Sequence, residues 1–144
     1  MDLRNEIGLI AHSLTGNPNF IYGRKSEVNI KGDNESFPAV ILIEPDQFGF
    51  SLNSTTGTVK DRYNVFIQFV DIIDAHEDAN YRHPVVMAMT TLAKEFIQKL
   101  NASDLFNDLP ENIQGILVVD QYDVNVAGVE INIGQLTSLN PEQC

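Results

Sequence analysis

The chain has 144 residues, enough for one folded domain, and 43% of them are hydrophobic, enough for a real core. Nine basic residues against twenty acidic ones give a formal net charge of −11, which disfavours a protein that grips DNA through a basic face. No apolar run is long enough to span a membrane. Segment 1–10 has acids where a secretory signal has a basic flank, so we expect no secretion by that route.

Segment 2–15 is predicted to form the first helix. Asp2 supplies an acid for its first turn, and Pro18, which follows a glycine and an asparagine, ends it. Its apolar residues repeat at spacings of four, three and four, which is one face of an amphipathic helix: Leu3, Ile7, Ile10 and Leu14.

Segment 37–45 is predicted to be a strand buried on both faces, because its apolar run is nearly continuous. A short strand is expected before it, at residues 28–30. Segment 46–57 is rich in turn formers and predicts a projecting hairpin or arm. Phe48, Phe50 and Leu52 alternate on it with small or polar residues, so they are the candidate contact with a neighbouring subunit. The alternative is an arm that folds back on its own sheet.

Segment 58–72 is the clearest predicted strand, because apolar and polar residues alternate along it. One face carries Val59, Tyr63, Val65, Ile67 and Phe69. The opposite face of the sheet is expected to be solvated or to line something, and its polar residues are Arg62, Asn64, Gln68, Glu130 and Asn132.

The second half of the chain predicts a helix followed by two strands. Pro84 is expected to open a helix over residues 84–100, since its fixed φ and missing N–H suit the first helical position. Ser103 is expected to cap a short helical turn after it. Two alternating segments then predict strands, with Asn125 and Gly128 in the turn between them. Residues 136–144 predict a loose tail.

These elements predict one α+β domain over residues 1–144. A mainly antiparallel β-sheet carries the two main helices packed on one face, and a hairpin or arm projects from it.

Segment 71–83 combines acids with two histidines, a mixture that suits a transition metal. An enzyme that uses this segment with a metal is therefore one hypothesis. The spacing matches neither His-x3-His nor HExxH, so a solvated acidic loop is the preferred interpretation. Its titratable residues are Asp71, Asp74, His76, Glu77, Asp78 and His83.

Patterns for other catalytic chemistry are missing from the sequence. The serines occur without G-x-S-x-G, the glycines without a phosphate-binding loop pattern, and the single cysteine, Cys144, has no partner base near it in sequence. His12 lies beside the apolar stripe of the first helix and is expected on the surface. We therefore expect no enzymatic activity, metal or cofactor.

The order of elements resembles that of small tail-terminator and head–tail joining (neck-ring) proteins of tailed bacteriophages. A helix precedes the strand "FPAVILIEP", and an arm-like loop leads to the long strand "DRYNVFIQFVDI". A helix follows, and then the terminal hairpin "YDVNVAGVEINI". The resemblance spans most of the chain.

This resemblance implies a structural virion protein that forms a closed ring of six or twelve subunits. The ring would sit at the head–tail junction or tail end of the virion and contact tail-tube and neck or portal proteins. It would be made in the host cytoplasm and would let DNA pass without specific binding. Phe48, Phe50 and Leu52 would belong to the contact between subunits.

The negative charge fits such a channel, because carboxylates repel phosphates within a Debye length of about 8 Å. The residues expected at the lumen, or else on the outer rim, are Asp71, Asp74, Glu77 and Asp78. The alternative function is a small intracellular binding module with a peptide or ligand site on its sheet face.

Overall fold

The computed structural model describes residues 2–24, 36–73, 78–107, 109–119 and 125–138. Its six strands form one sheet in the order β1-β2-β4-β6-β5, and β3 also pairs with β4. The strand expected at residues 28–30 lies outside the described residues. The elements in chain order are α1 (Leu3–His12), β1 (Asn19–Gly23), β2 (Ala39–Ile43), β3 (Phe48–Asn53), β4 (Thr58–Ile72), α3 (Ala79–Ala102), β5 (Gln114–Val119) and β6 (Val126–Thr137).

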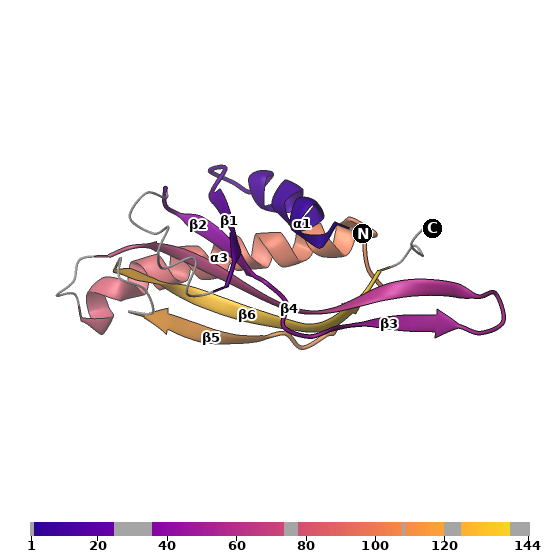
Figure 1. Ribbon diagram of the computed structural model, residues 1–144. Helices are drawn as coiled ribbons and strands as arrows, with labels where there is room; N and C mark the ends of the chain where they lie inside the picture. The colour runs from indigo at the N-terminus through magenta and orange to yellow at the C-terminus, as the bar shows by residue number, and fades with distance from the viewer. Residues whose placement is uncertain (1, 25–35, 74–77, 108, 120–124, 139–144) are drawn as a thin grey trace.

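The sheet is mainly antiparallel, as predicted; β1 and β2 are its parallel pair. β4 is the longest strand and organises the sheet (Figure 1). One edge of β4 pairs with β6, and the other edge changes partner along its length. Residues 58–63 pair with β3, whereas residues 67–70 pair with β2.

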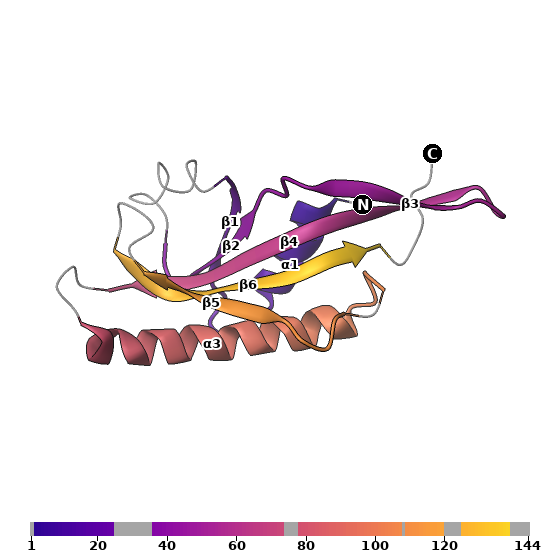
Figure 2. The same cartoon turned by 90° about the horizontal axis from the view of Figure 1, so that it is seen from below.

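Both helices pack on one face of the sheet, which confirms the predicted arrangement. Figure 2 shows α3 running along the length of the sheet. Phe69 of β4 and Phe96 of α3 meet edge to face at the centre of the core, with ring centroids 5.6 Å apart. From α1, the buried apolar residues are Leu3, Ile7, Ala11 and, just after the helix, Leu14. The predicted stripe thus faces the core, with Ile10 at its margin.

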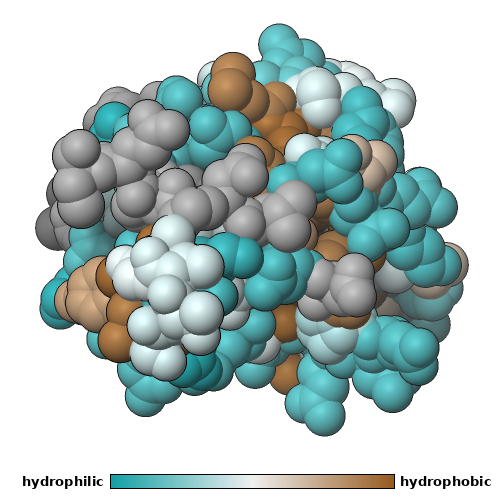
Figure 3. All heavy atoms as spheres, turned by 90° about the vertical axis from the view of Figure 1, so that its right-hand side faces the viewer, coloured by the Kyte–Doolittle hydropathy of each residue, from teal (hydrophilic) through white to brown (hydrophobic). Residues whose placement is uncertain are grey.

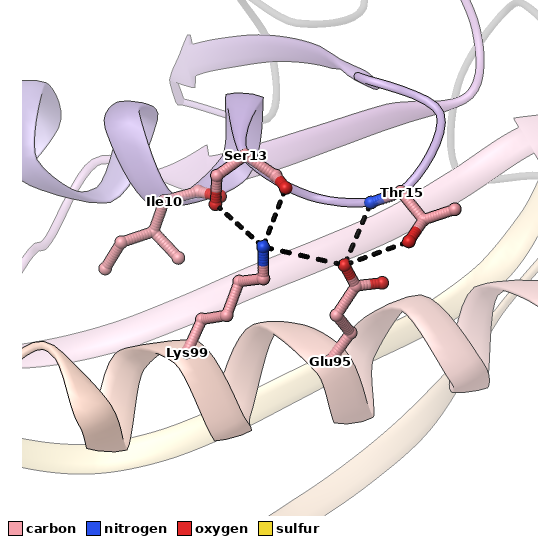
Figure 4. Close-up of polar contacts among 5 residues, drawn as sticks. All are labelled: Ile10, Ser13, Thr15, Glu95 and Lys99. Atoms are coloured by element: carbon pink, nitrogen blue, oxygen red, sulfur yellow. Dashed lines mark hydrogen bonds and ion pairs between the residues drawn. The ribbon is translucent and has the colours of Figure 1, made fainter.

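Polar contacts tie the end of α1 to the middle of α3 (Figure 4). The Glu95 carboxylate accepts hydrogen bonds from the backbone N–H and the hydroxyl of Thr15, at 2.9 and 3.1 Å. The Lys99 ammonium donates to the backbone carbonyl of Ser13 at 2.7 Å. This cation lies where the negative end of the α1 dipole favours it. The two helices are therefore fixed relative to each other at this end of α1.

α3 begins earlier than the sequence predicts. The helix begins at Ala79, and the carboxylate of Asp78 caps it by accepting hydrogen bonds from the backbone N–H groups of Asn80 and Tyr81, at 2.9 and 3.3 Å. Pro84 consequently lies inside the helix and removes one bond from its ladder. The prediction was wrong because an aspartate cap can start a helix ahead of a proline.

The face of the sheet away from the helices, which was expected to be solvated or to line something, is only partly solvated. Gln68 is fully buried and Glu130 almost so, and the Gln68 amide donates a hydrogen bond of 2.9 Å to the Glu130 carboxylate. These two residues are cross-strand partners on β4 and β6. Asn132, by contrast, is exposed as predicted. A second apolar cluster includes Ile21, Ala39, Ile41, Val70, Val118 and Val126.

The boundaries of β6 also differ from prediction. Gly128 lies inside the strand, opposite Val70, and not in the preceding turn. A Cβ atom at Gly128 would lie 1.9 Å from the carbonyl oxygen of Phe69, so this glycine permits a close approach of two backbones. At the other end, Leu136 is buried and the Ser138 N–H donates to the Asp61 carbonyl at 2.9 Å. The predicted start of the loose tail, at residue 136, is therefore too early.

Ser103 ends α3 and does not start another helix. Its hydroxyl donates to the Leu100 carbonyl at 2.6 Å, and it is the C-cap residue of α3. Asp104 follows with a positive φ of 58°, which turns the chain. The predicted short helical turn is absent from the described residues that follow Ser103.

Candidate functional site

A two-stranded arm projects from one end of the sheet (Figure 1). β6 ends opposite Arg62, and Ser138 bonds to the backbone of Asp61, so residues 58–60 of β4 pair with β3 alone. The turn at the tip is held by Asn53, whose side-chain oxygen accepts from the N–H groups of Thr55 and Thr56 at 3.0 and 3.3 Å. Gly57 takes the positive φ of 74° that this turn needs. The predicted projecting hairpin is confirmed.

One face of the arm is apolar and exposed. Phe48, Phe50 and Leu52 are 71%, 64% and 65% exposed. The two phenylalanine rings contact each other edge to face, with centroids 6.3 Å apart. Leu52 pairs across the arm with Val59, which is also exposed. The arm therefore does not fold back to bury these side chains among the described residues.

The apolar face of the arm continues the helix-facing side of the sheet. Phe48 is the cross-strand partner of Tyr63, and side chains at Tyr63, Val65 and Ile67 alternate onto one face of β4. The helices cover that face over the core, whereas the arm extends past their cover (Figure 2). The face of β4 that packs in the core thus continues onto the arm, where no helix covers it.

The opposite face and the base of the arm are polar. Lys60 and Arg62 alternate with the apolar side of β4, and the Arg62 guanidinium contacts the side-chain oxygen of Gln135. A hollow of about 430 Å³ at the base is lined by Asp46, Gln47, Phe48, Gly49, Arg62, Tyr63, Asn64 and Gln135. Figure 3 looks along the molecule from the arm end and shows hydrophobic atoms in separate places between hydrophilic ones.

Tyr63 joins the arm to the core. The pKa of Tyr63 is raised to about 12. The largest cause is partial burial of the phenol, followed by the negative charge of Asp61 and the hydrogen bond between the phenol and Asp61. The phenol is therefore neutral, and a hydrogen-bond donor to Asp61, throughout the physiological range.

The end of β4 and the start of α3, which carry the predicted residues Asp71 and Asp78, lie at the opposite end of the molecule from the arm (Figure 1). Asp71, near the end of β4, accepts a hydrogen bond from the Ile72 N–H, and Asp78 caps α3. The other two, Asp74 and Glu77, lie outside the described residues, as does His76. The structure therefore places Asp71 and Asp78 at one end but does not place the four as a set.

The histidines that can be placed lie apart. His83 is exposed within α3, so it is not a cap, and His12 is exposed at the end of α1, as predicted, with its ring against Phe20. Across the described ranges, no group of three His, Cys, Asp or Glu side chains is arranged to hold a metal ion. Cys144 lies outside those ranges.

Sequence reasoning missed two exposed features. Ile116 and Leu117 are more than half exposed on β5, an edge strand, where the loose alternation of the segment gave no sign of their exposure. A hollow between α1 and β1 was also missed, because it forms only when β1 packs beside α1.

Neither α1 nor α3 is long and apolar enough to cross a lipid bilayer. In comparisons with known proteins, the chain matches no family model and no curated protein.

Proposed function

We propose that the protein is a structural virion protein of a tailed bacteriophage, which forms a ring at the head–tail junction or tail end. The ring, of six or twelve subunits, caps or joins the tail and lets DNA pass without binding it specifically. The observation that carries this proposal is the arm, with Phe48, Phe50 and Leu52 exposed on one face. An arm of this kind suits contact between identical subunits better than it suits catalysis.

The energetics of the arm favour a partner. Fully burying a large apolar side chain stabilises by about 1.5–3 kcal/mol, and three such side chains are mostly exposed on the arm. The arm leaves the body of the subunit on one side, and in the proposed ring it contacts a different surface on the neighbouring copy. Contacts of that type close into a ring when the rotation between copies permits.

The charge balance is compatible with a DNA channel. A net charge of −11 disfavours tight binding of the phosphate backbone. Asp71 and Asp78 lie at the end remote from the arm, so contact through the arm leaves them free to face a lumen or an outer rim. The proposal includes tail-tube and neck or portal proteins as the neighbours along the channel.

Particle size tests the proposal directly. Mass photometry and electron microscopy of the protein, alone at high concentration and with its tail tube, are expected to reveal rings. The double variant Phe48→Ser/Phe50→Ser is expected to lose rings and keep the circular dichroism of the folded subunit. The control Ser51→Thr, on the opposite face of β3, is expected to keep them. Monomers alone under every condition would refute the proposal.

A second candidate is a small binding module, which the hollow at the base of the arm favours. Its polar lining includes Arg62, Asn64 and Gln135 on the sheet face. A volume of about 430 Å³ falls within the range of small-ligand sites. A monomeric protein whose melting temperature rises with a small polar ligand, and no longer does so in the variant Arg62→Ala, would support this function instead of the ring.

A further inference from the structure

A second hollow, with a lining of mixed polar and apolar residues, lies between α1 and β1. Its volume is about 380 Å³. Leu9 stands at its rim and is 61% exposed. The Phe20 ring comes within 3.1 Å of where a Cβ of Gly8 would lie, so the glycine lets this half-buried ring pack directly against α1 where it lines the hollow. The lining residues, named here as the α1–β1 groove, are Arg4, Asn5, Gly8, Leu9, His12, Phe20 and Tyr22.

The α1–β1 groove combines this apolar surface with basic groups. Arg4 and His12 line it, and no acidic residue does. Arg4 is exposed and makes no hydrogen bond or ion pair with any residue the structure describes. On a chain with a net charge of −11, Arg4 thus brings a positive charge to this groove, although Asp2 and Glu6 lie nearby at the start of α1. The occupant that fits it carries an aromatic or aliphatic side chain next to a carboxylate.

The arm presents that combination. Phe50 and Asp61 are direct cross-strand partners, so their side chains project from the same face of the arm, about 5 Å apart at Cβ. Phe48 and Leu52 flank Phe50 on that face, one on each side. An aromatic ring with a neighbouring carboxylate thus matches a groove of Phe20, Leu9 and Arg4 in both shape and charge.

We propose that the arm of one copy docks in the α1–β1 groove of the next copy. Phe50 would pack on Leu9 and Phe20. Asp61, whose carboxylate already accepts a hydrogen bond from the Tyr63 phenol, would pair with Arg4 through its remaining acceptor positions. The arm cannot serve its own groove in the described conformation, because Phe48, Phe50 and Leu52 are all exposed there. The contact joins two different surfaces, so it repeats from copy to copy. This inference rests on the proposed ring and names the surface that receives the arm.

Cross-linking tests the contact by position. In a Cys144→Ser background, Leu52→Cys on the arm is mixed with Leu9→Cys on the groove, and a short bismaleimide is added. Phe50 and Asp61 stay intact in both variants. We expect a dimer that contains one copy of each variant. The matched control replaces the groove variant with Leu117→Cys, which is similarly exposed on β5 and is expected to give no such dimer.

Charge exchange tests the pairing by chemistry. Arg4→Asp and Asp61→Arg are each expected to weaken assembly about tenfold or more, since like charges then face each other. The double variant is expected to recover most of that loss. Lys94→Asp, at an exposed position on α3, changes the net charge as much as Arg4→Asp does and is expected to leave assembly nearly unchanged. Denaturation midpoints confirm that each variant folds.

The outcomes separate this inference from the proposed function. Rings that depend on Phe48 and Phe50, but form normally with Arg4→Asp and give no Leu52–Leu9 cross-link, would overturn the groove contact and leave the ring intact. Absence of rings in the unmodified protein, with its tail tube present, would overturn the proposed function. A Leu52–Leu9 cross-link together with rescue in the double charge variant supports the groove contact.

Discussion

Replacing Gly128 by alanine should destabilise the fold more than any other single-methyl addition that we identify. Gly128 lies in β6, opposite Val70 of β4. The added Cβ would be 1.9 Å from the Phe69 carbonyl oxygen and 2.9 Å from the Cα of Val70. Both of these atoms are backbone, so no side-chain rotation relieves the clash.

The size of the effect follows from this geometry. Real Cβ contacts below 3.0 Å essentially do not occur, so β4 and β6 must separate locally. Overpacking a core costs about 1–3 kcal/mol, and each weakened ladder hydrogen bond adds about 0.5–1.5 kcal/mol. We therefore expect Gly128→Ala to lower the free energy of unfolding by roughly 3–5 kcal/mol, a large part of the roughly 5–15 kcal/mol of a typical domain.

Chemical denaturation with circular dichroism measures this loss. Gly115→Ala is the matched control, because Gly115 also lies in a strand but its Cβ would meet the nearest atom at 3.6 Å, an ordinary contact. The control should change stability by no more than about 1 kcal/mol, and alanine there can even stabilise. Equal midpoints for Gly128→Ala and the unmodified protein would refute the close-approach argument.

Three further predictions concern single contacts. The raised pKa of Tyr63, about 12, means that folding favours its neutral phenol, so this contribution to stability is complete below the ordinary value of 10.0 and is lost as pH rises toward about 12. Tyr63→Phe should remove that pH dependence and the highest-pKa step in an ultraviolet absorbance titration; an unchanged titration would refute the assignment. Asp78→Ala should cost about 1 kcal/mol in denaturation by removing the α3 cap, and Asp78→Asn much less. Glu95→Ala should cost about 0.5–1.5 kcal/mol by removing the hydrogen bonds from Thr15, whose exposed donors can then bond to water. Lys94→Ala, at an exposed neighbouring position, should be neutral; equal losses would contradict the proposed helix contact.

Local patterns in the sequence predicted the elements whose signal is local. The spacing of Leu3 and Ile7 predicts α1, and the alternation along residues 58–72 predicts β4 because its side chains have one apolar face. The residues after Leu52 are common in turns, so they predict the tip of the arm from local sequence as well. Each of these patterns can be recognised without knowing what the segment packs against.

Features that depend on pairing between distant segments could not be predicted in this way. Glu130 and Gln68 are polar and were expected to be solvated or to line something. They are instead buried against each other, because β4 pairs with β6 in one register. Gly128 is of a residue type that is common in turns. Its role here, which is to let β6 approach β4 closely, depends on the position of the Phe69 carbonyl. Asp78 was treated as part of an acidic loop, although its spacing before Asn80 and Tyr81 is that of a cap.

The candidate site likewise has one part that local sequence predicts and one part that it does not. The exposed stripe of Phe48, Phe50 and Leu52 could be predicted, because alternating apolar residues in a turn-rich segment imply an uncovered arm. The α1–β1 groove could not, because Leu9 and Phe20 meet only after α1 packs beside β1. Arg4 alone gives no signal in the sequence that it faces such a groove.

The exchange of partners along β4 has a mechanical consequence. Because the arm and the centre of the sheet share one unbroken strand, a pull on the arm along β4 is transmitted directly into the β4–β6 ladder. That ladder is loaded in shear, so many hydrogen bonds resist the force together. The outer hairpin, paired on one side only, can still fray and exchange its amide hydrogens quickly. The tip of the arm can therefore open locally, while its base is held by the β4–β6 ladder at the centre of the sheet.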